Sequence, residues 1–418
     1  MESTPQVAAS DLYPPVQEAV ARLAGLPEVR AAFERFRSEE SQFALWQAEA
    51  TRVPAPPFGE TARGVWLADR FRELGLTDVQ MDEVGNVFGV RPGYGSRFVA
   101  LSAHMDTVFP ATTPLNIRQQ GTRLYGPGVS DNAAGITAML AVASVLSSSA
   151  ITHALPFLFI GNVGEEGEGD LRGMRHVFQT PRWRDAIAYS VIVDGAGSDT
   201  VVAEALGSRR FEVIARGPGG HSWSDFGTPN PIIVLARAIH SLSETPVPAS
   251  PKTTFNIGVI RGGTSVNSIP ESASMRVDLR STSMAEIDRL ERALRVALDH
   301  AVDSQNLPAA SRSSRPTQVV QSEVIEIGNR PAGELSRDAR ILKVIRAVDA
   351  QLGNTAQIQR ASTDANIPLS LGREAIAIGG GGTGGGAHTL QEWFDCHGRD
   401  LGLWRILLTM LALSGVGE

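Results

Sequence analysis

Three apolar runs of the sequence end in side chains that can bind metal ions or carry protons. They are "RFVALSAHMD" (97–106) with His104 and Asp106, "ALPFLFIGNV" (154–163) followed by Glu165 and Glu166, and "YSVIVDGAG" (189–197) with Asp194. Runs of this length and composition predict strands that are buried on both faces of a parallel sheet. Because ligands bind beside the carboxyl ends of such strands, we expect these side chains to share one crevice.

The geometry of one of these groups can be anticipated from the sequence, and two other acidic groups also have an ordinary structural explanation. His104 and Asp106 stand two positions apart, so on a strand they point the same way, and the carboxylate can bond the ring nitrogen that faces away from a metal. Glu165 and Glu166 form either a site or a solvated acidic turn, in which crowded like charges repel unless cations or solvent compensate. Asp131, in the loop "GPGVSDNAAG", is either a metal ligand or the N-cap of the following helix.

The combination favours a centre with two metal ions. The only cysteine is Cys396, which excludes a cysteine-cluster zinc site and an intramolecular disulfide, whereas histidine and carboxylate ligands suit a catalytic zinc or a similar ion. The carboxylates of Asp131, Glu166 and Asp194 (−3), with neutral imidazoles and two divalent ions (+4), leave +1, which a bridging hydroxide neutralises. Glu165, adjacent to a ligand, is then placed to accept the proton of the bridging water and pass it to a leaving nitrogen.

A glycine-rich stretch near the end of the chain, "IGGGGTGGGAHTLQEW" (378–393), presents His388. A phosphate-binding loop would need a lysine after the glycines, and none follows here. A linker is also disfavoured, because a buried strand is predicted before the stretch and a helix after it. We therefore expect a loop whose glycines allow close approach of the backbone and deliver His388 to the second metal ion.

The predicted elements divide the chain into an α/β domain and an inserted α+β module. Early helices are predicted up to about residue 75, before the buried strands, and a crossover helix is expected over 132–146. This alternation of strand, helix and strand is typical of a mostly parallel sheet. From residue 208 the pattern becomes β-α-β-β-α-β, similar to a split βαβ plan, with a capping box of Ser283 and Glu286. The predicted domains are residues 1–207 and 331–418 of the catalytic domain and 208–330 of the insertion.

Composition narrows the setting in which the protein acts. The 418 residues are too many for one core. A net charge of −7, from 45 acidic and 38 basic residues without long runs of either sign, argues against a nucleic-acid surface. The first twenty residues lack the pattern of a signal peptide, and no run approaches the roughly 18 apolar residues of a membrane span. We expect a cytoplasmic protein without a membrane partner.

Six short motifs resemble those of a known family. "HMD", "SDNAAG", "GNVGEEG", "VDG", "GPGGHSW" and a late "AHT" follow the order found in the dinuclear zinc exopeptidase and aminoacylase family, which includes peptidase T, glutamate carboxypeptidase and succinyl-diaminopimelate desuccinylase. The resemblance runs from about residue 55 almost to the end. It implies a zinc-exopeptidase-like α/β catalytic domain, interrupted by a lid that commonly also dimerises, so a homodimer is expected.

The resemblance also implies residue roles. Asp131 would bridge two zinc ions, or cobalt or manganese in their place, and Asp106 would orient one histidine. Glu165 would be the general base and acid, and the bond between residues 131 and 132 would be cis. The other metal ligands would be His104 and Asp194 on one ion and Glu166 and His388 on the other. In the lid, His221 would help hold the scissile carbonyl oxygen, while Asn267 and Arg280 would contact substrate, Arg280 through a two-pronged grip on a carboxylate.

The substrate class depends on one position. Where this chain has Asp194, the aminopeptidase and tripeptidase branches of the resembling family tend to have Asp, and carboxypeptidases and deacylases tend to have Glu. This favours a peptidase that acts on short peptides with a free N-terminus. The alternatives are an N-acyl-amino-acid amidohydrolase or carboxypeptidase with the same metal centre, and, more remotely, a binding protein without catalysis.

Overall fold

The computed structural model of the chain describes residues 14–312 and 318–415. The chain forms two compact units, which are described separately below. The first unit contains Met1–Ala205 and Gly333–Glu418, and the second contains Leu206–Ala332.

A nine-stranded mixed sheet forms the centre of the first unit. Its order is β1-β2-β6-β3-β7-β17-β8-β15, with β16 paired to β8, and the four central strands β6, β3, β7 and β17 run parallel. Both faces of these strands are buried among apolar side chains, which is why their sequences are mostly hydrophobic. The strands are β1 (Thr77–Met81), β2 (Val87–Arg91), β3 (Phe98–His104), β6 (Phe157–Asn162), β7 (Ile187–Val193), β8 (Thr200–Ala205), β15 (Gly333–Glu334), β16 (Gln357–Ala361) and β17 (Glu374–Ile378).

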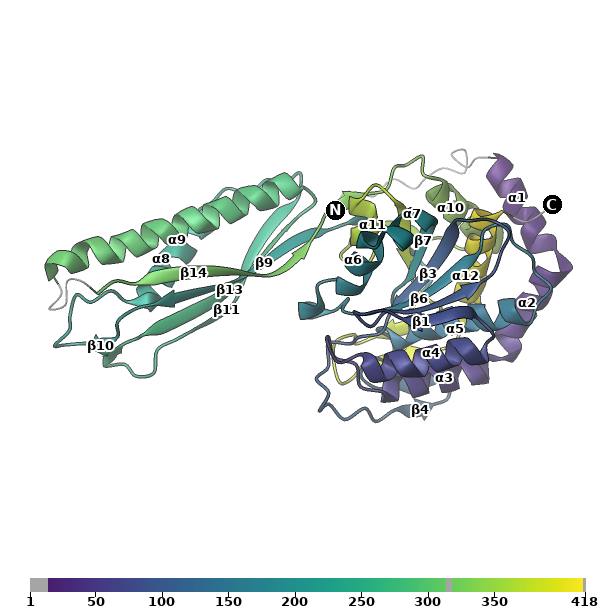
Figure 1. The fold of residues 1–418 in the computed structure, drawn as a ribbon, viewed down its shortest axis with the longest axis horizontal. Helices are drawn as coiled ribbons and strands as arrows, with labels where there is room; N and C mark the ends of the chain where they lie inside the picture. Colours follow the sequence, from purple (N-terminus) through teal and green to yellow (C-terminus); the bar gives the residue numbers. More distant parts are fainter. Residues whose placement is uncertain (1–13, 313–317, 416–418) are drawn as a thin grey trace. The chain divides into compact units, whose positions relative to one another are not determined.

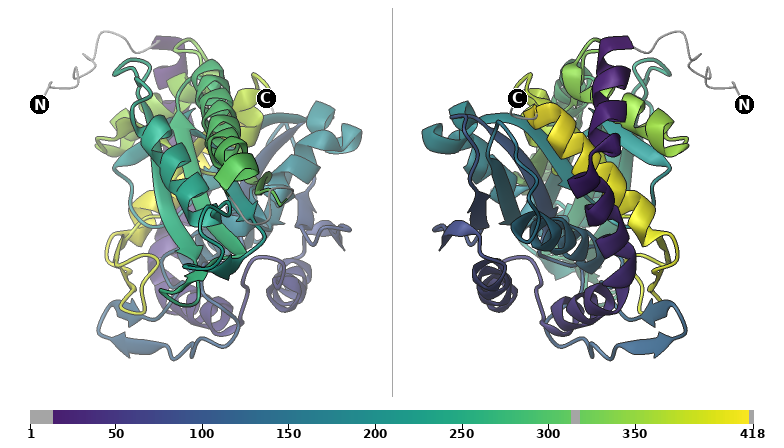
Figure 2. Two further views of the ribbon diagram at one scale, coloured as in Figure 1. Left: turned by 90° about the vertical axis from the view of Figure 1, so that its left-hand side faces the viewer. Right: turned by 90° about the vertical axis from the view of Figure 1, so that its right-hand side faces the viewer.

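Helices cover this sheet. The helix α5 (Ala133–Ser147) is apolar on all sides and almost wholly buried, as expected of a crossover helix between β3 and β6. The last helix α12 (Arg399–Ser414) packs beside α1 (Pro14–Gly25) and α10 (Arg340–Leu352), so the first and last described helices lie in one layer (Figure 2). The remaining helices are α2 (Pro27–Ser38), α3 (Glu40–Arg52), α4 (Thr61–Glu73), α6 (Arg172–Gln179), α7 (Pro181–Ala186) and α11 (Asn366–Ser370).

The second unit is a four-stranded antiparallel sheet with two helices on one face (Figure 1). Burial alternates along its strands, which gives the sheet one face packed under the helices. The strand order is β11-β13-β9-β14, so β11 is an edge strand. The elements are β9 (Gly207–Arg216), α8 (Pro231–Ser243), β11 (Thr253–Gly262), β13 (Ser272–Ser281), α9 (Met284–Arg312) and β14 (Gln321–Arg330).

The capping box predicted at the start of α9 is wrong: the Glu286 amide donates to the backbone carbonyl of Ser283 at 3.2 Å. The Ser283 amide donates to Ser281 Oγ at 3.1 Å, and the Glu286 carboxylate accepts from Arg289 at 2.9 Å. The amide that the glutamate would cap is bonded by the serine that ends β13, and the glutamate forms an ion pair along the helix instead.

Short strands build two smaller sheets. One contains β4 (Arg118–Gln120), β5 (Arg123–Tyr125), β18 (Thr383–Gly385) and β19 (Trp393–Asp395), so the glycine-rich stretch is part of a sheet and not a linker. The other, in the second unit, pairs β10 (Gly220–His221) with β12 (Ser268–Ile269).

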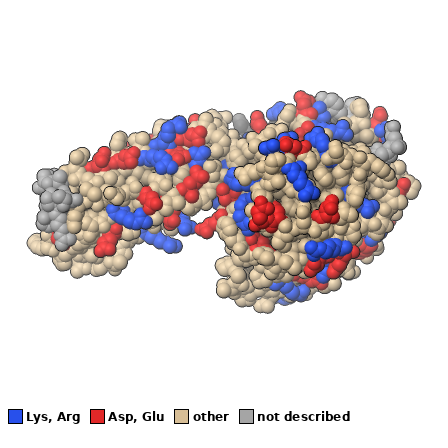
Figure 3. Space-filling view, viewed as in Figure 1, with Lys and Arg blue, Asp and Glu red and all other residues tan. Residues whose placement is uncertain are grey.

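The architecture confirms the predicted fold class, an α/β unit with a largely parallel central sheet and a separate antiparallel α+β unit. On the face drawn in Figure 3, acidic and basic side chains are interspersed on both units and form no stripe of one sign. Within the described ranges, no helix has the length and apolarity needed to cross a bilayer.

Candidate metal centre

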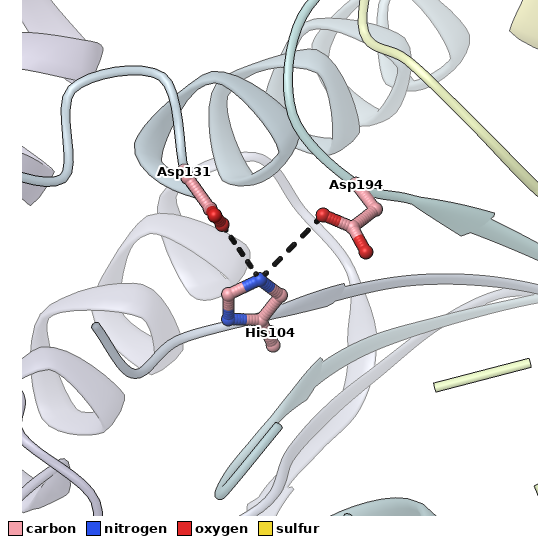
Figure 4. A group of neighbouring side chains, drawn as sticks. All are labelled: His104, Asp131 and Asp194. Carbon is pink, nitrogen blue, oxygen red and sulfur yellow. Dashed lines mark ion pairs between the residues drawn. The ribbon is translucent and has the colours of Figure 1, made fainter. Parts of the chain in front are cut away.

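The carboxyl ends of neighbouring parallel strands bring His104, Asp131 and Asp194 together (Figure 4). His104 is the last residue of β3, and Asp194 directly follows β7, the neighbouring strand. Asp131 precedes α5. His104 Nε2 lies 3.1 Å from Asp131 Oδ1 and 3.8 Å from Asp194 Oδ1.

Asp131 also belongs to a second group, with Glu166 and His388. His388 Nε2 lies 3.1 Å from Asp131 Oδ2 and 2.9 Å from Glu166 Oε1. In each group, the candidate ligand atoms all lie within 4.8 Å of one another. The two oxygens of one carboxylate therefore face two different sets of ligands, as a bridging ligand between two ions requires.

Asp131 is not the N-cap of α5, although its sequence position allowed that explanation. Asn132 takes this role: its Oδ1 accepts from the amides of Gly135 and Gly195, each at 3.0 Å, and its Nδ2 donates to the Val193 carbonyl at 2.9 Å. The peptide bond between residues 131 and 132 is cis, as the resemblance implied. Because Asn132 caps the helix, the Asp131 carboxylate is available to the two histidines.

Asp106 acts mainly on the backbone of the acidic turn. His104 Nδ1 faces the backbone carbonyl of Asp106 at 3.1 Å, and the carboxylate of Asp106 lies farther away, at 3.6 Å. That carboxylate is fully buried and accepts from the amides of Glu165 and Glu166, at 2.9 and 2.7 Å. Asp106 thus fixes the position of the predicted base and its neighbouring ligand as well as the histidine.

The pKa directions show how negative this pocket is. Burial alone would lower the pKa of His104, but the carboxylates of Asp106, Asp131 and Asp194 around its ring raise it well above its ordinary value. A hydrogen bond to Asp131, followed by the charges of Glu166 and Asp131, raises the pKa of His388 to about 9. Burial raises the pKa of Glu166, and the nearby Asp131 carboxylate raises it further. The cluster attracts positive charge, which divalent cations can supply in place of protons.

The donor set fits two divalent ions. Asp131 Oδ1 is buried, and no described group donates a hydrogen bond to it, although His104 Nε2 lies close by. A buried carboxylate oxygen without a donor is costly unless a cation compensates it. Imidazole and carboxylate ligands without sulfur are typical of catalytic zinc and related ions.

The sequence matches the family described as peptidase family M20/M25/M40 over residues 100–403. The chain belongs to this family. A probable carboxypeptidase of Aspergillus clavatus is 31% identical over 203 residues, which cover 44% of each chain. Carboxypeptidase G2 of a Pseudomonas species is 24% identical over 263 residues, 60% of this chain and 61% of that protein. The chain thus spans about half the length of the curated relatives it matches.

Solved structures of M20 peptidases share the fold. Aminopeptidase PepT of Bacillus cereus superposes with a TM-score of 0.71 at 20% identity, covering 90% of this chain and 99% of that one. The YXEP protein of Bacillus subtilis, described as a dinuclear metal binding peptidase of the M20 family, superposes with a TM-score of 0.60 at 14% identity, covering 90% and 99%. At these identities the likeness establishes the fold of the M20 family, including the inserted unit.

The three substrate-contact residues predicted in the lid all lie in the second unit, where each has local partners. His221 Nδ1 accepts from the Trp223 amide at 3.2 Å. The backbone carbonyl of Asn267 accepts from the Ser222 amide at 3.0 Å, and Arg280 Nε donates to Asp278 Oδ2 at 2.6 Å. The side chains of His221 and Arg280 are exposed to solvent, so a substrate contact stays a prediction for both.

Two buried acidic residues near the centre were not assigned a role from the sequence. Glu392, four positions after His388, is fully buried, and burial raises its pKa to about 7 despite three backbone amide donors. Asp364, in "STDANIP", accepts from Asn162 Nδ2 at 2.6 Å, and burial raises its pKa to about 7. Asp364 follows Ser362 and Thr363, and Glu392 follows Gln391, so neither stands out in the sequence as an acidic residue that will be buried.

Proposed function

We propose that this chain is a metal-dependent hydrolase of the M20 type that cleaves amide bonds in short peptides with a free N-terminus, as an aminopeptidase or tripeptidase does. The observation that carries the proposal is the sharing of Asp131 between two ligand groups, one with His104 and Asp194 and one with Glu166 and His388. This arrangement suits two divalent ions, which we propose to be zinc, with cobalt or manganese able to replace it.

The residues of the chain divide the chemical work. Two bound divalent ions would generate a nucleophile from water at neutral pH and polarise the scissile carbonyl. Glu165 removes the proton of the attacking water and delivers it to the leaving nitrogen. Its side chain is 6% exposed, and a carboxylate oxygen lies within 4.8 Å of the candidate ligand atoms of His104 and Glu166. Asp106 holds the Glu165 amide, which fixes the base relative to the ligands.

The substrate class is supported by Asp194 and by the fold shared with an aminopeptidase, PepT. A second candidate activity is favoured by a different observation, since both curated relatives described above are named carboxypeptidases. The rival activity is therefore that of a carboxypeptidase or an N-acyl-amino-acid amidohydrolase. In either case, we propose that His221, Asn267 and Arg280 contact the substrate from the second unit.

A homodimer through the second unit is part of the proposal. Strand β11 is an edge strand, and its side chains Val259 and Ile260 are 36% and 57% exposed. An edge strand that is exposed and apolar is suited to pairing with another strand. Light scattering coupled to size exclusion should give twice the monomer mass, and a monomer at micromolar concentration would contradict this part of the proposal.

Replacement of the base tests the mechanism. Glu165→Gln keeps the size of the side chain but cannot accept the proton. We expect it to bind two divalent ions per chain, as the wild type does, and to lose turnover by about 100-fold or more. Metal content is measured by elemental analysis after removal of free ions. Native turnover by this variant, or by the metal-free wild type, would refute the mechanism.

A substrate panel separates the two activities. Each di- and tripeptide is supplied with a free and with an acetylated N-terminus, beside N-acyl amino acids, in the presence of zinc, cobalt or manganese. The aminopeptidase proposal requires that acetylation abolish hydrolysis. Preference for the acetylated compounds would establish the rival activity with the same metal centre. If none of the compounds is hydrolysed, the remaining alternative is a binding protein without catalysis.

A further inference from the structure

We propose that Glu392 is a positioning residue: it fixes the loop of Asp131 to the loop of His388 and thereby sets the affinity for the ion held by Asp131, Glu166 and His388. The inference rests on the metal centre proposed above. It concerns a residue that the mechanism does not use and that no comparison with known proteins singles out.

The carboxylate of Glu392 binds three backbone amides in the loop before α5. Its Oε2 accepts from the Gly128 amide at 2.8 Å, and its Oε1 accepts from the amides of Ser130 and Asp131 at 2.7 and 2.8 Å. The side chain is 0% exposed, so water does not compete for these bonds. One side chain thus satisfies three buried donors, including the amide of the shared ligand itself.

The backbone of Glu392 strengthens the same connection. Its carbonyl accepts from the Gly126 amide at 3.0 Å, and its amide donates to the Thr389 carbonyl at 3.2 Å. Thr389 directly follows His388 and closes a turn on the Gly386 carbonyl. A movement of Glu392 relative to the Asp131 loop is therefore passed to His388 through a short, hydrogen-bonded segment.

A carboxylate is the side chain that this position needs. It has only acceptor sites, and hydrogen bonds from amides to a charged oxygen are about twice as strong as bonds between neutral groups. An amide side chain would place its own N–H groups against one of the three backbone donors. Gln47 of α3 also holds this loop, because its side chain donates to the Val129 carbonyl at 2.6 Å. The bonded carbonyl of Val129 thus lies in the sequence between the amides that Glu392 binds.

The effect should differ between the two ligand groups. In the group of Asp131, Glu166 and His388, Glu392 holds two of the three ligand-bearing segments. In the group of His104, Asp131 and Asp194, it holds only one, because His104 and Asp194 are fixed by β3 and β7. Loss of the clamp should therefore weaken one ion much more than the other.

The test is a metal titration of metal-free protein with Co²⁺, followed by calorimetry and by the visible absorption of the bound ion. His388→Ala identifies which binding step belongs to the group of His388. For Glu392→Gln, we expect that step to weaken by about 10- to 100-fold, with an altered Co²⁺ spectrum, while the other step changes by less than about threefold. Glu392→Asp, which keeps the charge but is too short to span all three amides, should weaken the same step.

The matched control is Asp349→Asn. Asp349 is buried in the same unit and pairs with Arg405 through bonds of 2.6 and 3.0 Å, but its partners carry no metal ligand. This variant should lose stability while both binding steps stay as in the wild type. The inference would be overturned if Glu392→Gln weakened both binding steps equally. It would also be overturned if Asp349→Asn weakened the step of His388 as much as Glu392→Gln does.

The outcomes also separate this inference from the function on which it rests. If the wild type binds no Co²⁺, the proposed metal centre is wrong. If the wild type binds two ions and both Glu392 variants bind them as tightly and with the same spectrum, the centre stands and the positioning role is wrong. If either Glu392 variant does not fold, the other gives the answer, since both are read from the same binding step.

Discussion

The substitution Gly384→Ala tests whether the glycine-rich stretch is required by close packing against the Asp131 loop. Gly384 lies in β18, and a Cβ atom at this position would stand 2.2 Å from Ser130 Oγ, 3.1 Å from Ser130 Cβ and 3.0 Å from Ala196 Cβ. Rotation of the Ser130 hydroxyl relieves the first contact. The other two involve atoms that cannot rotate away, so the backbone must move by a few tenths of an ångström.

The size of the effect follows from these distances. Forcing an additional methyl group into a filled interior costs about 1–3 kcal/mol. Ser130 precedes Asp131, and the amides of both are held by Glu392. The displacement therefore acts on Asp131, a candidate metal ligand, and we expect the affinity for metal to fall by about 10-fold in addition to the loss of stability.

Gly25→Ala is the control, because the methyl group that it adds at the end of α1 would have no atom of the described residues within 4 Å. Alanine there should leave stability unchanged or raise it by about 0.4–1 kcal/mol. Stability is followed by chemical denaturation, and metal affinity by competition with a chelator. If Gly384→Ala resembles Gly25→Ala in both measurements, the packing argument is refuted.

Two further predictions use the pKa directions away from the metal centre. Burial lowers the pKa of His153, so its contribution to stability is present above the unfolded pKa of about 6.5 and is lost as the pH falls below it. His153→Phe, which can keep the ring stacked 4.0 Å from Phe157, should show a smaller drop in the unfolding midpoint between pH 7.5 and pH 5 than the wild type, and an equal drop would contradict this. Burial and the nearby Glu40 raise the pKa of Cys396 to about 11. At pH 8, iodoacetamide should therefore alkylate the folded protein about 100-fold more slowly than free cysteine. The unfolded protein should react like free cysteine.

The central strands were predictable because burial on both faces demands a mostly apolar run. The strands β3, β6, β7 and β17 each satisfy this rule, with only isolated polar residues such as Ser102 and Ser190. Strand β16 (Gln357–Ala361) does not, since its sequence "QIQRA" is polar and its place beside β8 depends on a partner that lies far away in the chain. The strands of three residues around the glycine-rich stretch are too short to show any periodicity.

The strand ends predicted which histidine and acidic side chains the structure brings together, but not the groups that hold these side chains in place. Which group Asp106 bonds depends on the turn at Glu165 and Glu166, whose two amides point toward its carboxylate. Glu392 contacts backbone amides some 260 positions earlier in the chain, and amides are present at every residue except proline. Contacts with backbone leave no pattern of side-chain types, so the sequence predicts the candidate ligands but not the groups that support them.

The glycine-rich stretch shows how such supports constrain composition. The amides of Gly380 and Gly381 donate to the carbonyls of Gly195 and Gly197, so these two amides already have partners in the loop that follows Asp194. A side chain at Gly379 would collide with the Ala196 carbonyl at 2.4 Å. The stretch therefore packs its backbone against the loop that follows Asp194, and Gly384 packs against the side chain of Ser130, next to Asp131, before the stretch presents His388. Glycine at these positions lets the loops that carry Asp131, Asp194 and His388 approach more closely than a Cβ atom at Gly379 or Gly384 would permit.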